Sequence, residues 1–163
     1  MARPQRLATF DYLGPHRYSI TICALDRRPV FTDAAVVELT LSHFLQEATR
    51  FACAVVAYCV MPDHVHLLVE GTTEDADLQS FVAIAKQKSG FDFARRGGRR
   101  LWQKGYYERV LRGDESTVDV IRYLIANPVR AGLVEEPIEY RFWGSGIHSR
   151  EEMIDLIALE RHR

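Results

Sequence analysis

Two histidines spaced one residue apart are the first candidates for chemistry in this sequence. They stand in the stretch from Tyr58 to Glu70, which reads Tyr-Cys-Val-Met-Pro-Asp-His-Val-His-Leu-Leu-Val-Glu. Apolar runs flank Met61-Pro62-Asp63, and a Pro-Asp pair between such runs is typical of a turn. Because side chains alternate across a strand, we expect His64 and His66 to emerge on one face of the second strand of a hairpin.

Two imidazoles on one face of a strand can hold a divalent metal ion. The alternative is a pair of surface or hydrogen-bonded histidines, since the spacing of His64 and His66 also occurs by chance. A metal site needs a further ligand from elsewhere in the chain.

A helix late in the chain supplies such a ligand. Ser116-Thr-Val-Asp119 resembles a capping box with Asp in place of Glu, and Pro128 disfavours helical geometry at the residue before it. The pattern therefore predicts a helix over about 117–126 that ends at Asn127. At about 100° per residue, the apolar side chains gather on one side and Ser116, Asp119, Tyr123 and Asn127 on the other. Tyr123 and Asn127 lie one turn apart, so their side chains can reach the same point.

The elements before this helix follow the order strand, helix, strand, strand, helix, strand. They are a strand from Arg17 to Ala24, a helix capped by Thr32 or Asp33, the hairpin, a helix from about Leu78 that ends before Gly97-Gly98, and a strand from Tyr106 to Leu111. This order predicts an α+β fold of the ferredoxin-like kind, a four-stranded antiparallel sheet with helices on one face. The helix with Tyr123 is an addition at the C-terminal side.

The bulk composition fits one soluble domain. We expect residues 1–163 to form a single unit with a core of about 17–140 and a tail of 141–163. Apolar residues make up 47% and charged residues 26% of the chain. Cys23, Cys53 and Cys59 lie in apolar runs without a C-x-x-C pair, which predicts reduced core residues and a cytoplasmic location. We expect neither export nor membrane insertion, because the first residues lead into no apolar signal-peptide core and the longest apolar run, from Phe51 to Met61, is too short to span a bilayer.

The net charge of −1 hides an uneven distribution. The segment from Lys86 to Arg112 holds nine Lys or Arg against two acids, whereas Glu135 to Arg163 holds seven acids against four arginines. Aromatic residues interrupt the basic tract, a mixture that suits phosphates and stacked bases. The alternative is a solvated surface. The candidate DNA contacts are Arg95, Arg96, Arg99, Arg100, Lys104, Arg109 and Arg112.

Three motifs stand together in the chain. They read Met61-Pro-Asp-His-Val-His-Leu-Leu-Val69, Trp102-Gln-Lys-Gly-Tyr-Tyr-Glu-Arg109 and Tyr123-Leu-Ile-Ala-Asn-Pro-Val-Arg-Ala-Gly-Leu-Val134. In this order, between about Tyr18 and Tyr140, the sequence resembles the REP-associated tyrosine transposases. These form a branch of the single-tyrosine HUH transposases of bacterial insertion sequences.

The resemblance implies an enzyme that cleaves and rejoins single-stranded DNA through a 5′-phosphotyrosine, on hairpins from repetitive extragenic palindromes (REP). It implies that Tyr123 is the nucleophile and that His64, His66 and Asn127 bind Mg²⁺ or Mn²⁺. Insertion-sequence relatives often carry Gln where this chain has Asn127, which is one methylene shorter. The ligand types alone also admit Zn²⁺.

Several alternatives stay open at this point. Tyr106 and Tyr107 are rival nucleophiles, and Asp119 is a weak candidate for the general base. The protein could instead be a non-catalytic nucleic-acid-binding module, or a zinc hydrolase that activates water. It could act as a monomer or as a homodimer. A predicted acidic helix from Glu151 to Glu160 belongs to a tail that could enter the active site and compete with DNA.

Overall fold

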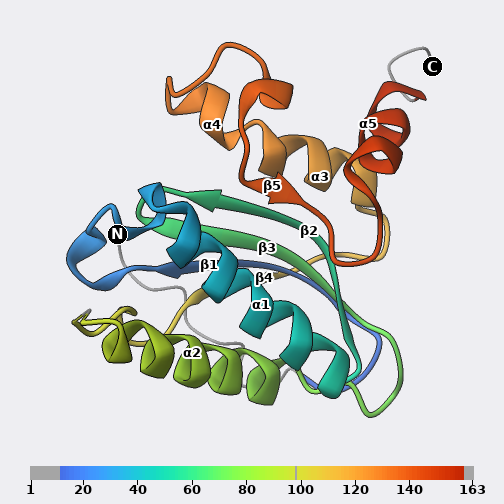
Figure 1. Ribbon diagram of the computed structural model, residues 1–163. Coiled ribbons are helices and arrows are strands. Elements are labelled where there is room, and N and C mark those ends of the chain that lie inside the picture. Colours follow the sequence, from blue (N-terminus) through green and yellow to red (C-terminus); the bar gives the residue numbers. More distant parts are fainter. Residues whose placement is uncertain (1–11, 98, 160–163) are drawn as a thin grey trace.

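The computed structural model describes residues 12–97 and 99–159, in which an antiparallel sheet lies between two layers of helices (Figure 1). The strands are β1 (Arg17–Cys23), β2 (Cys53–Met61), β3 (His64–Gly71), β4 (Tyr107–Val110) and β5 (Trp143–Gly144), in the sheet order β4-β1-β3-β2-β5. The helices are α1 (Ala34–Arg50), α2 (Leu78–Arg95), α3 (Thr117–Ile125), α4 (Asn127–Arg130) and α5 (Arg150–Leu159). Short 3₁₀ turns occupy Leu25–Arg27, Val30–Thr32 and Pro137–Glu139.

The predicted ferredoxin-like order of elements is confirmed. The first six elements run strand, helix, strand, strand, helix, strand, and β4 and β2 flank the central pair of β1 and β3. Asp33 caps α1 by accepting a hydrogen bond from the backbone N–H of Ala35, as one of the two predicted caps. The fourth strand is one residue shorter at each end than predicted.

The prediction of four strands needs one correction, because β5 joins the sheet beside β2. Tyr58 pairs with Gly144 and Cys59 with Trp143. A strand of two residues is too short to show an alternating pattern, so no pattern in the sequence indicates it. Gly144 packs closely on Tyr58, since a Cβ at this position would lie 2.7 Å from the Tyr58 hydroxyl and would force that side chain to shift.

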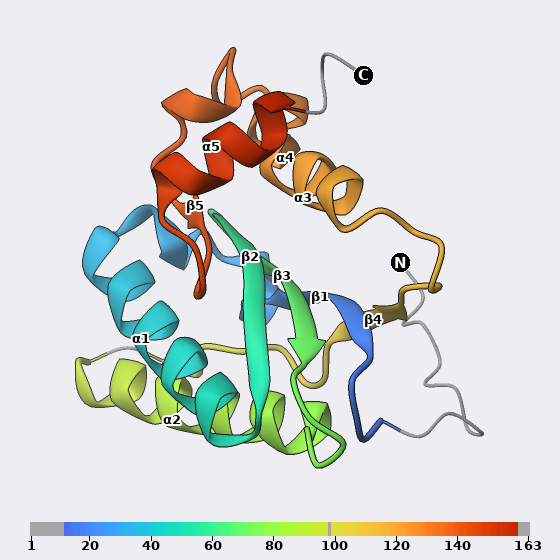
Figure 2. The ribbon, with the colours of Figure 1, turned by 90° about the vertical axis from the view of Figure 1, so that its right-hand side faces the viewer.

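Apolar side chains cover both faces of the sheet. Helices α1 and α2 pack on one face around residues such as Phe44, Phe81 and Leu67. Helices α3 and α5 pack on the other face, where Leu68 meets a second apolar cluster (Figures 1 and 2). The sheet is therefore a middle layer, and the residues of β3 alternate between the two cores.

The helix with Tyr123 starts as predicted, and a second short helix follows it. Ser116 caps α3 by accepting a hydrogen bond from the backbone N–H of Asp119. The predicted end is confirmed within one residue, because Ala126 is the C-cap of α3; the short helix α4 that follows was not predicted. Pro128 is tolerated there, since it stands in the first turn of α4, where an intrahelical N–H bond is not needed.

The C-terminal part forms α5, which confirms the predicted helix from Glu151 over the described residues; residue 160, its predicted end, lies outside them. Within the described ranges, no helix combines the length and hydropathy needed to cross a bilayer. The three cysteines are free and buried, as expected of reduced core residues.

Glu47 links helices α1 and α2, which cover one face of the sheet. The carboxylate is buried, and it accepts hydrogen bonds from Lys88 on α2 and, at 3.2 Å, from Arg50 on α1. The hydrogen bond from Lys88 holds the pKa of Glu47 below its ordinary value, although burial acts in the opposite direction. The ionised carboxylate therefore stabilises the fold.

We expect Glu47→Gln to lower the free energy of unfolding by about 1 to 3 kcal/mol at pH 7, because the charge-assisted bonds are lost. A carboxyl whose pKa is lowered by folding stabilises fully above its ordinary pKa of 4.5, and less as the pH falls through the folded value. The difference between wild type and variant should therefore shrink below pH 4.5. Urea denaturation across this range measures it, with Glu38→Gln on the exposed side of α1 as control. A difference that does not change with pH would contradict the assignment.

Candidate active site

The two histidines of β3 lie on the sheet face that α3 covers. His64 and His66 share their face of β3 with Leu68, which packs in the apolar cluster beneath α3. The Nε2 atoms of the two rings lie 2.9 Å apart, and the ring planes stand at 89° to one another. The structure thus has both imidazoles on one face with their Nε2 atoms converging on one point.

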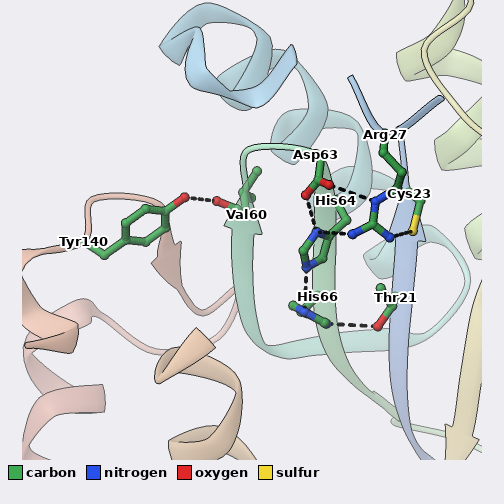
Figure 3. A network of polar contacts seen from close by, with 8 residues as sticks. All are labelled: Thr21, Cys23, Arg27, Val60, Asp63, His64, His66 and Tyr140. Carbon is green, nitrogen blue, oxygen red and sulfur yellow. Dashed lines mark hydrogen bonds and ion pairs between the residues drawn. The ribbon is translucent and has the colours of Figure 1, made fainter. Parts of the chain in front are cut away.

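Hydrogen bonds on the Nδ1 side hold both rings in place (Figure 3). Nδ1 of His64 lies 2.6 Å from a carboxylate oxygen of Asp63, and Nδ1 of His66 lies 2.9 Å from the hydroxyl of Thr21. Thr21 stands directly opposite His66 in the pairing of β1 with β3. Because both Nδ1 atoms are engaged, the Nε2 atoms are the positions left for a ligand.

Arg27 contacts Asp63 and thereby supports the orientation of His64 (Figure 3). Its Nε donates a hydrogen bond of 2.8 Å to Asp63, and its Nη1 lies 3.1 Å from the sulfur of Cys23. The backbone is strained at this position. Asp26 and Arg27 have φ angles of 56° and 53°, in the left-handed region that such residues rarely adopt. The strained turn brings a guanidinium group to the carboxylate that orients His64.

The local environment keeps the imidazoles neutral. Burial lowers the pKa of His64 from 6.5, against the opposing effect of Asp63. Burial, and then the charges of His64 and Arg130, lower the pKa of His66 to about 3. Burial raises the pKa of Asp63, but the bonds from His64 and Arg27 outweigh it and keep the carboxyl ionised. A neutral imidazole is the form that binds metal ions.

The donor set fits a divalent cation with octahedral ligands. Two ligands at adjacent octahedral positions, with bonds of about 2.1 Å, stand about 3 Å apart, close to the separation of the two Nε2 atoms. Without a cation, one ring can instead donate an N–H to the other. No group of three His, Cys, Asp or Glu side chains is placed to hold a metal within residues 12–97 and 99–159. Asn127, water or DNA would have to complete the coordination.

Tyr123 and Asn127 share a cavity with His66. The cavity has a volume of about 560 Å³ and lies between β1, β3, β4 and α3. Tyr123 is 69% exposed, because Ile121, Leu124 and Ile125 on the other side of α3 pack on the sheet. The cavity therefore contains three of the four predicted catalytic and metal-binding residues. The fourth, His64, does not line the cavity but contacts His66 through its Nε2 atom.

Asn127 is held by two hydrogen bonds. Its amide nitrogen donates to the carbonyl of Leu124 at 2.9 Å, and its carbonyl oxygen accepts from Arg130. A carbonyl oxygen has two lone pairs, so one remains after the bond with Arg130. This remaining lone pair is the feature of Asn127 that could serve a metal ion.

The rival tyrosines take different faces of the sheet. Tyr106 is buried in the cluster beneath α1 and α2. Tyr107 stands opposite Thr21 in the pairing of β1 with β4, so it shares the face of the histidines without lining the cavity of Tyr123. Alternation thus leaves Tyr107 as the rival on the relevant face.

The predicted DNA contacts fall into two groups. Arg95, Arg96, Arg99, Arg100 and Lys104 are exposed at the end of α2 and in the following loop. Arg109 lines the cavity of Tyr123 and forms two hydrogen bonds of 2.8 and 2.9 Å with Glu115, while Arg112 is exposed nearby. Of these seven residues, Arg109 is the one that lines the cavity of Tyr123.

The C-terminal tail packs behind α3. Tyr140 donates a hydrogen bond to the carbonyl of Val60 (Figure 3), and Met153 is fully buried in the cluster beneath α3. Arg122 donates a hydrogen bond of 2.6 Å to the carbonyl of Ile157. Within the described part of the tail, no residue lines the cavity of Tyr123. The tail therefore supports the helix from the side opposite the cavity.

Sequence reasoning did not find Thr21, Arg27 or Arg130. Thr21 and Arg27 act on partners that are 45 and 36 residues away, and only strand pairing and a left-handed turn bring them close. Asp63 was visible next to His64 but read as a turn residue. Arg130 had a signal, since it follows Tyr123 by seven residues and Asn127 by three, on one side of a helix.

A ferredoxin-like sheet with a histidine pair, opposite an exposed tyrosine on a following helix, defines the class of single-tyrosine DNA transposases that the sequence resembles. The chain belongs to the family described as "Transposase IS200 like", whose sequence model matches residues 14–127. The expectation of a transposase is thereby confirmed.

Two individual proteins are similar to this chain. A protein of Haemophilus influenzae named "Putative REP-associated tyrosine transposase" is 27% identical over 136 residues, which cover 77% of each chain. A solved structure described as a REP-associated tyrosine transposase bound to a REP hairpin superposes with a TM-score of 0.72 at 19% identity. The match covers 88% of this chain and 82% of that one, and it confirms the fold.

We expect Met153→Ala to destabilise the protein by about 2 to 5 kcal/mol, because it removes a buried side chain beneath α3. Amide hydrogen exchange should rise in α3 more than in α1, since Met153 packs with Ile121 and Leu124. Denaturation and exchange measurements test this, with the exposed Ile147→Ala as control. Equal exchange in both helices would show that the tail does not hold α3.

Proposed function

We propose that this protein cleaves and rejoins single-stranded DNA through Tyr123, with Mg²⁺ or Mn²⁺ held by His64, His66 and Asn127. The observation that carries the proposal is that Tyr123, His66 and Asn127 line one cavity. Membership of the transposase family supports DNA as the substrate. The hairpin-bound relative supports hairpin DNA, of the REP kind, as the form in which it is presented.

The reaction that fits these groups is a transfer of a phosphoryl group to the phenol. The oxygen of Tyr123 attacks a phosphorus atom of the DNA backbone while the bond from phosphorus to the 3′ oxygen breaks. The phenol loses its proton, and the leaving 3′ oxygen takes one up. The products are a 5′-phosphotyrosine and a free 3′-OH, and attack by another 3′-OH reverses the step and joins strands without an external energy source.

A divalent ion at the histidine pair would bind a nonbridging phosphate oxygen and offset the charge that builds up in the transition state. The chain's own contribution is to fix the ligands. Asp63 and Thr21 hold the imidazoles by their Nδ1 atoms, and Arg130 holds the amide of Asn127. Such supporting contacts commonly matter ten- to a hundredfold for metal affinity.

Asp119 is the candidate acceptor for the phenol proton. It lies on the same side of α3 as Tyr123, one turn earlier, and lines the cavity. Its carboxylate also accepts a hydrogen bond of 3.2 Å from Arg122. A carboxylate held beside the nucleophile suits proton transfer in either direction as the reaction reverses.

The basic residues would bind the DNA backbone. Arg95, Arg96, Arg99, Arg100 and Lys104 form an exposed cationic stretch, and Arg109 and Arg112 add positive charge near the cavity. The acidic lining of the cavity, with Asp114, Glu115 and Asp119, balances Arg109 there. We therefore assign the phosphate backbone outside the cavity mainly to the stretch after α2.

The packing supports a site that is complete within one chain. Helix α3 lies on the same sheet that carries His64 and His66, and Arg17 ties the start of α3 to β1 through hydrogen bonds to Thr117 and the carbonyl of Glu115. A monomer can therefore supply all proposed groups, and a homodimer would not need to exchange the helix.

Two other functions remain as outcomes of experiment. A non-catalytic nucleic-acid-binding module predicts binding that EDTA does not change and no cleavage of any hairpin. A zinc hydrolase that activates water predicts cleavage that survives loss of Tyr123. Neither function uses the shared cavity of Tyr123 and Asn127, which is why we favour the first proposal.

We expect Tyr123→Phe to abolish a covalent protein–DNA adduct while it changes hairpin binding little, because only the attacking oxygen is removed. The assay incubates the protein with single-stranded hairpin oligonucleotides and Mn²⁺, and a denaturing gel separates the slower adduct. Tyr107→Phe, on the same sheet face, is the matched control and should keep the adduct. An adduct that persists in Tyr123→Phe would refute the assignment.

We expect His66→Ala to abolish Mn²⁺ binding, and Asp63→Asn to weaken it by about tenfold or more, because the orienting carboxylate is lost. Isothermal titration calorimetry measures both affinities without DNA. His148→Ala, which changes an exposed histidine of the tail, should bind Mn²⁺ as the wild type does. Unchanged binding in His66→Ala would remove the histidine pair from the proposal.

A further inference from the structure

Arg130 lies against the proposed nucleophile. Its guanidinium carbon stands 3.9 Å from the centroid of the Tyr123 ring, in a cation–π contact. Its Nη2 donates a hydrogen bond of 2.9 Å to the carbonyl of Tyr123 and another to the carbonyl oxygen of Asn127. One side chain thus contacts both residues that the helix pair contributes to the site.

The helical turn of α4, which follows α3 directly, creates this contact. Arg130 is the last residue of α4 and follows Tyr123 by seven residues, about two turns. Because α4 continues after Ala126, Arg130 returns to the side of the helix that carries Tyr123 and Asn127. Its positive charge also reaches the histidine pair, where it contributes to lowering the pKa of His66, after burial and His64.

The guanidinium group of Arg130 has further N–H groups that can bind a ligand. Of its nitrogens, Nη2 makes both hydrogen bonds, and no bond of Nε or Nη1 is found within the described residues. The side chain is exposed. The N–H groups of Nε and Nη1 can each donate a hydrogen bond to a phosphate oxygen, and such charge-assisted bonds are strong.

We propose that Arg130 is a catalytic residue that binds a nonbridging oxygen of the phosphate attacked by Tyr123. This inference rests on the proposed function. A phosphate placed for attack by the phenol oxygen would lie beside the ring on which Arg130 stacks. Negative charge grows on its nonbridging oxygens as the new bond forms, and a fixed cation stabilises that charge more than the starting state.

The competing explanation is that Arg130 only fastens α4 to α3. Both explanations predict that Arg130→Ala reduces activity, so a rate alone does not separate them. They differ in whether the loss depends on the phosphate oxygen. A substrate in which that oxygen is missing makes the distinction.

The experiment uses hairpin oligonucleotides with a single methylphosphonate at the cleavage position, which is first mapped on unmodified DNA. A methylphosphonate replaces one nonbridging oxygen by a neutral methyl group, and its two diastereomers are tested separately. On unmodified DNA, we expect Arg130→Ala to slow adduct formation by about 100-fold at saturating DNA and Mn²⁺. On the diastereomer that lacks the oxygen bound by Arg130, the same substitution should cost less than about threefold, because the partner is already absent.

An equal penalty on unmodified DNA and on both diastereomers would overturn the role in phosphate binding and leave a fastening role. Absence of any adduct with wild-type protein on unmodified DNA would instead overturn the proposed function, and the inference with it. The two failures are therefore distinguishable.

Two variants complete the test. Arg130→Lys keeps the positive charge but not the planar guanidinium group, so we expect a smaller loss of rate than for Arg130→Ala. If the alanine variant does not fold, the lysine variant replaces it in the comparison of the substrates. Arg141→Ala removes another exposed arginine that stacks on an aromatic ring, at 5.4 Å from Phe142, and should leave all rates unchanged. Thermal unfolding of each variant verifies the fold.

Discussion

The packing of α3 on the sheet is the contact on which the site depends. Ile121, Leu124 and Ile125 bury one side of the helix against the sheet, and this packing leaves Tyr123 and Asn127 on the side that lines the cavity of His66. The position of Tyr123 is thus a consequence of hydrophobic burial on the far side of its own helix. The tail adds to this burial through Met153, which explains why a segment remote from the cavity belongs to the functional unit.

The histidine pair follows a second constraint, which is that two neutral rings are held with their Nε2 atoms 2.9 Å apart. Alternation along β3 places them on one face, and the hydrogen bonds of their Nδ1 atoms with Asp63 and Thr21 select the nitrogen that is presented. The strained turn that delivers Arg27 to Asp63 is a local cost. This unfavourable conformation is retained in a turn that fixes Asp63, and through Asp63 the ring of His64.

Much of the fold was predictable because its signals are local. Strand alternation gave the hairpin of His64 and His66, and helical periodicity placed Tyr123 and Asn127 on the polar side of α3. The fifth strand and the continuation into α4 were not predictable, since the first has two residues and the second contradicts the usual effect of Pro128. Thr21, Arg27 and Arg130 gain their roles only from tertiary placement, and the motif around Tyr123 contained Arg130 without indicating its stacking.

The most direct measurement of the central claim is the identity of the residue that carries DNA. Protein incubated with hairpin DNA and Mn²⁺ is digested with nuclease and protease, and mass spectrometry locates the remaining nucleotide on a peptide. The account predicts a phosphodiester or phosphate ester on Tyr123. A label on Tyr107, on any other residue, or cleaved DNA with no labelled peptide would contradict it.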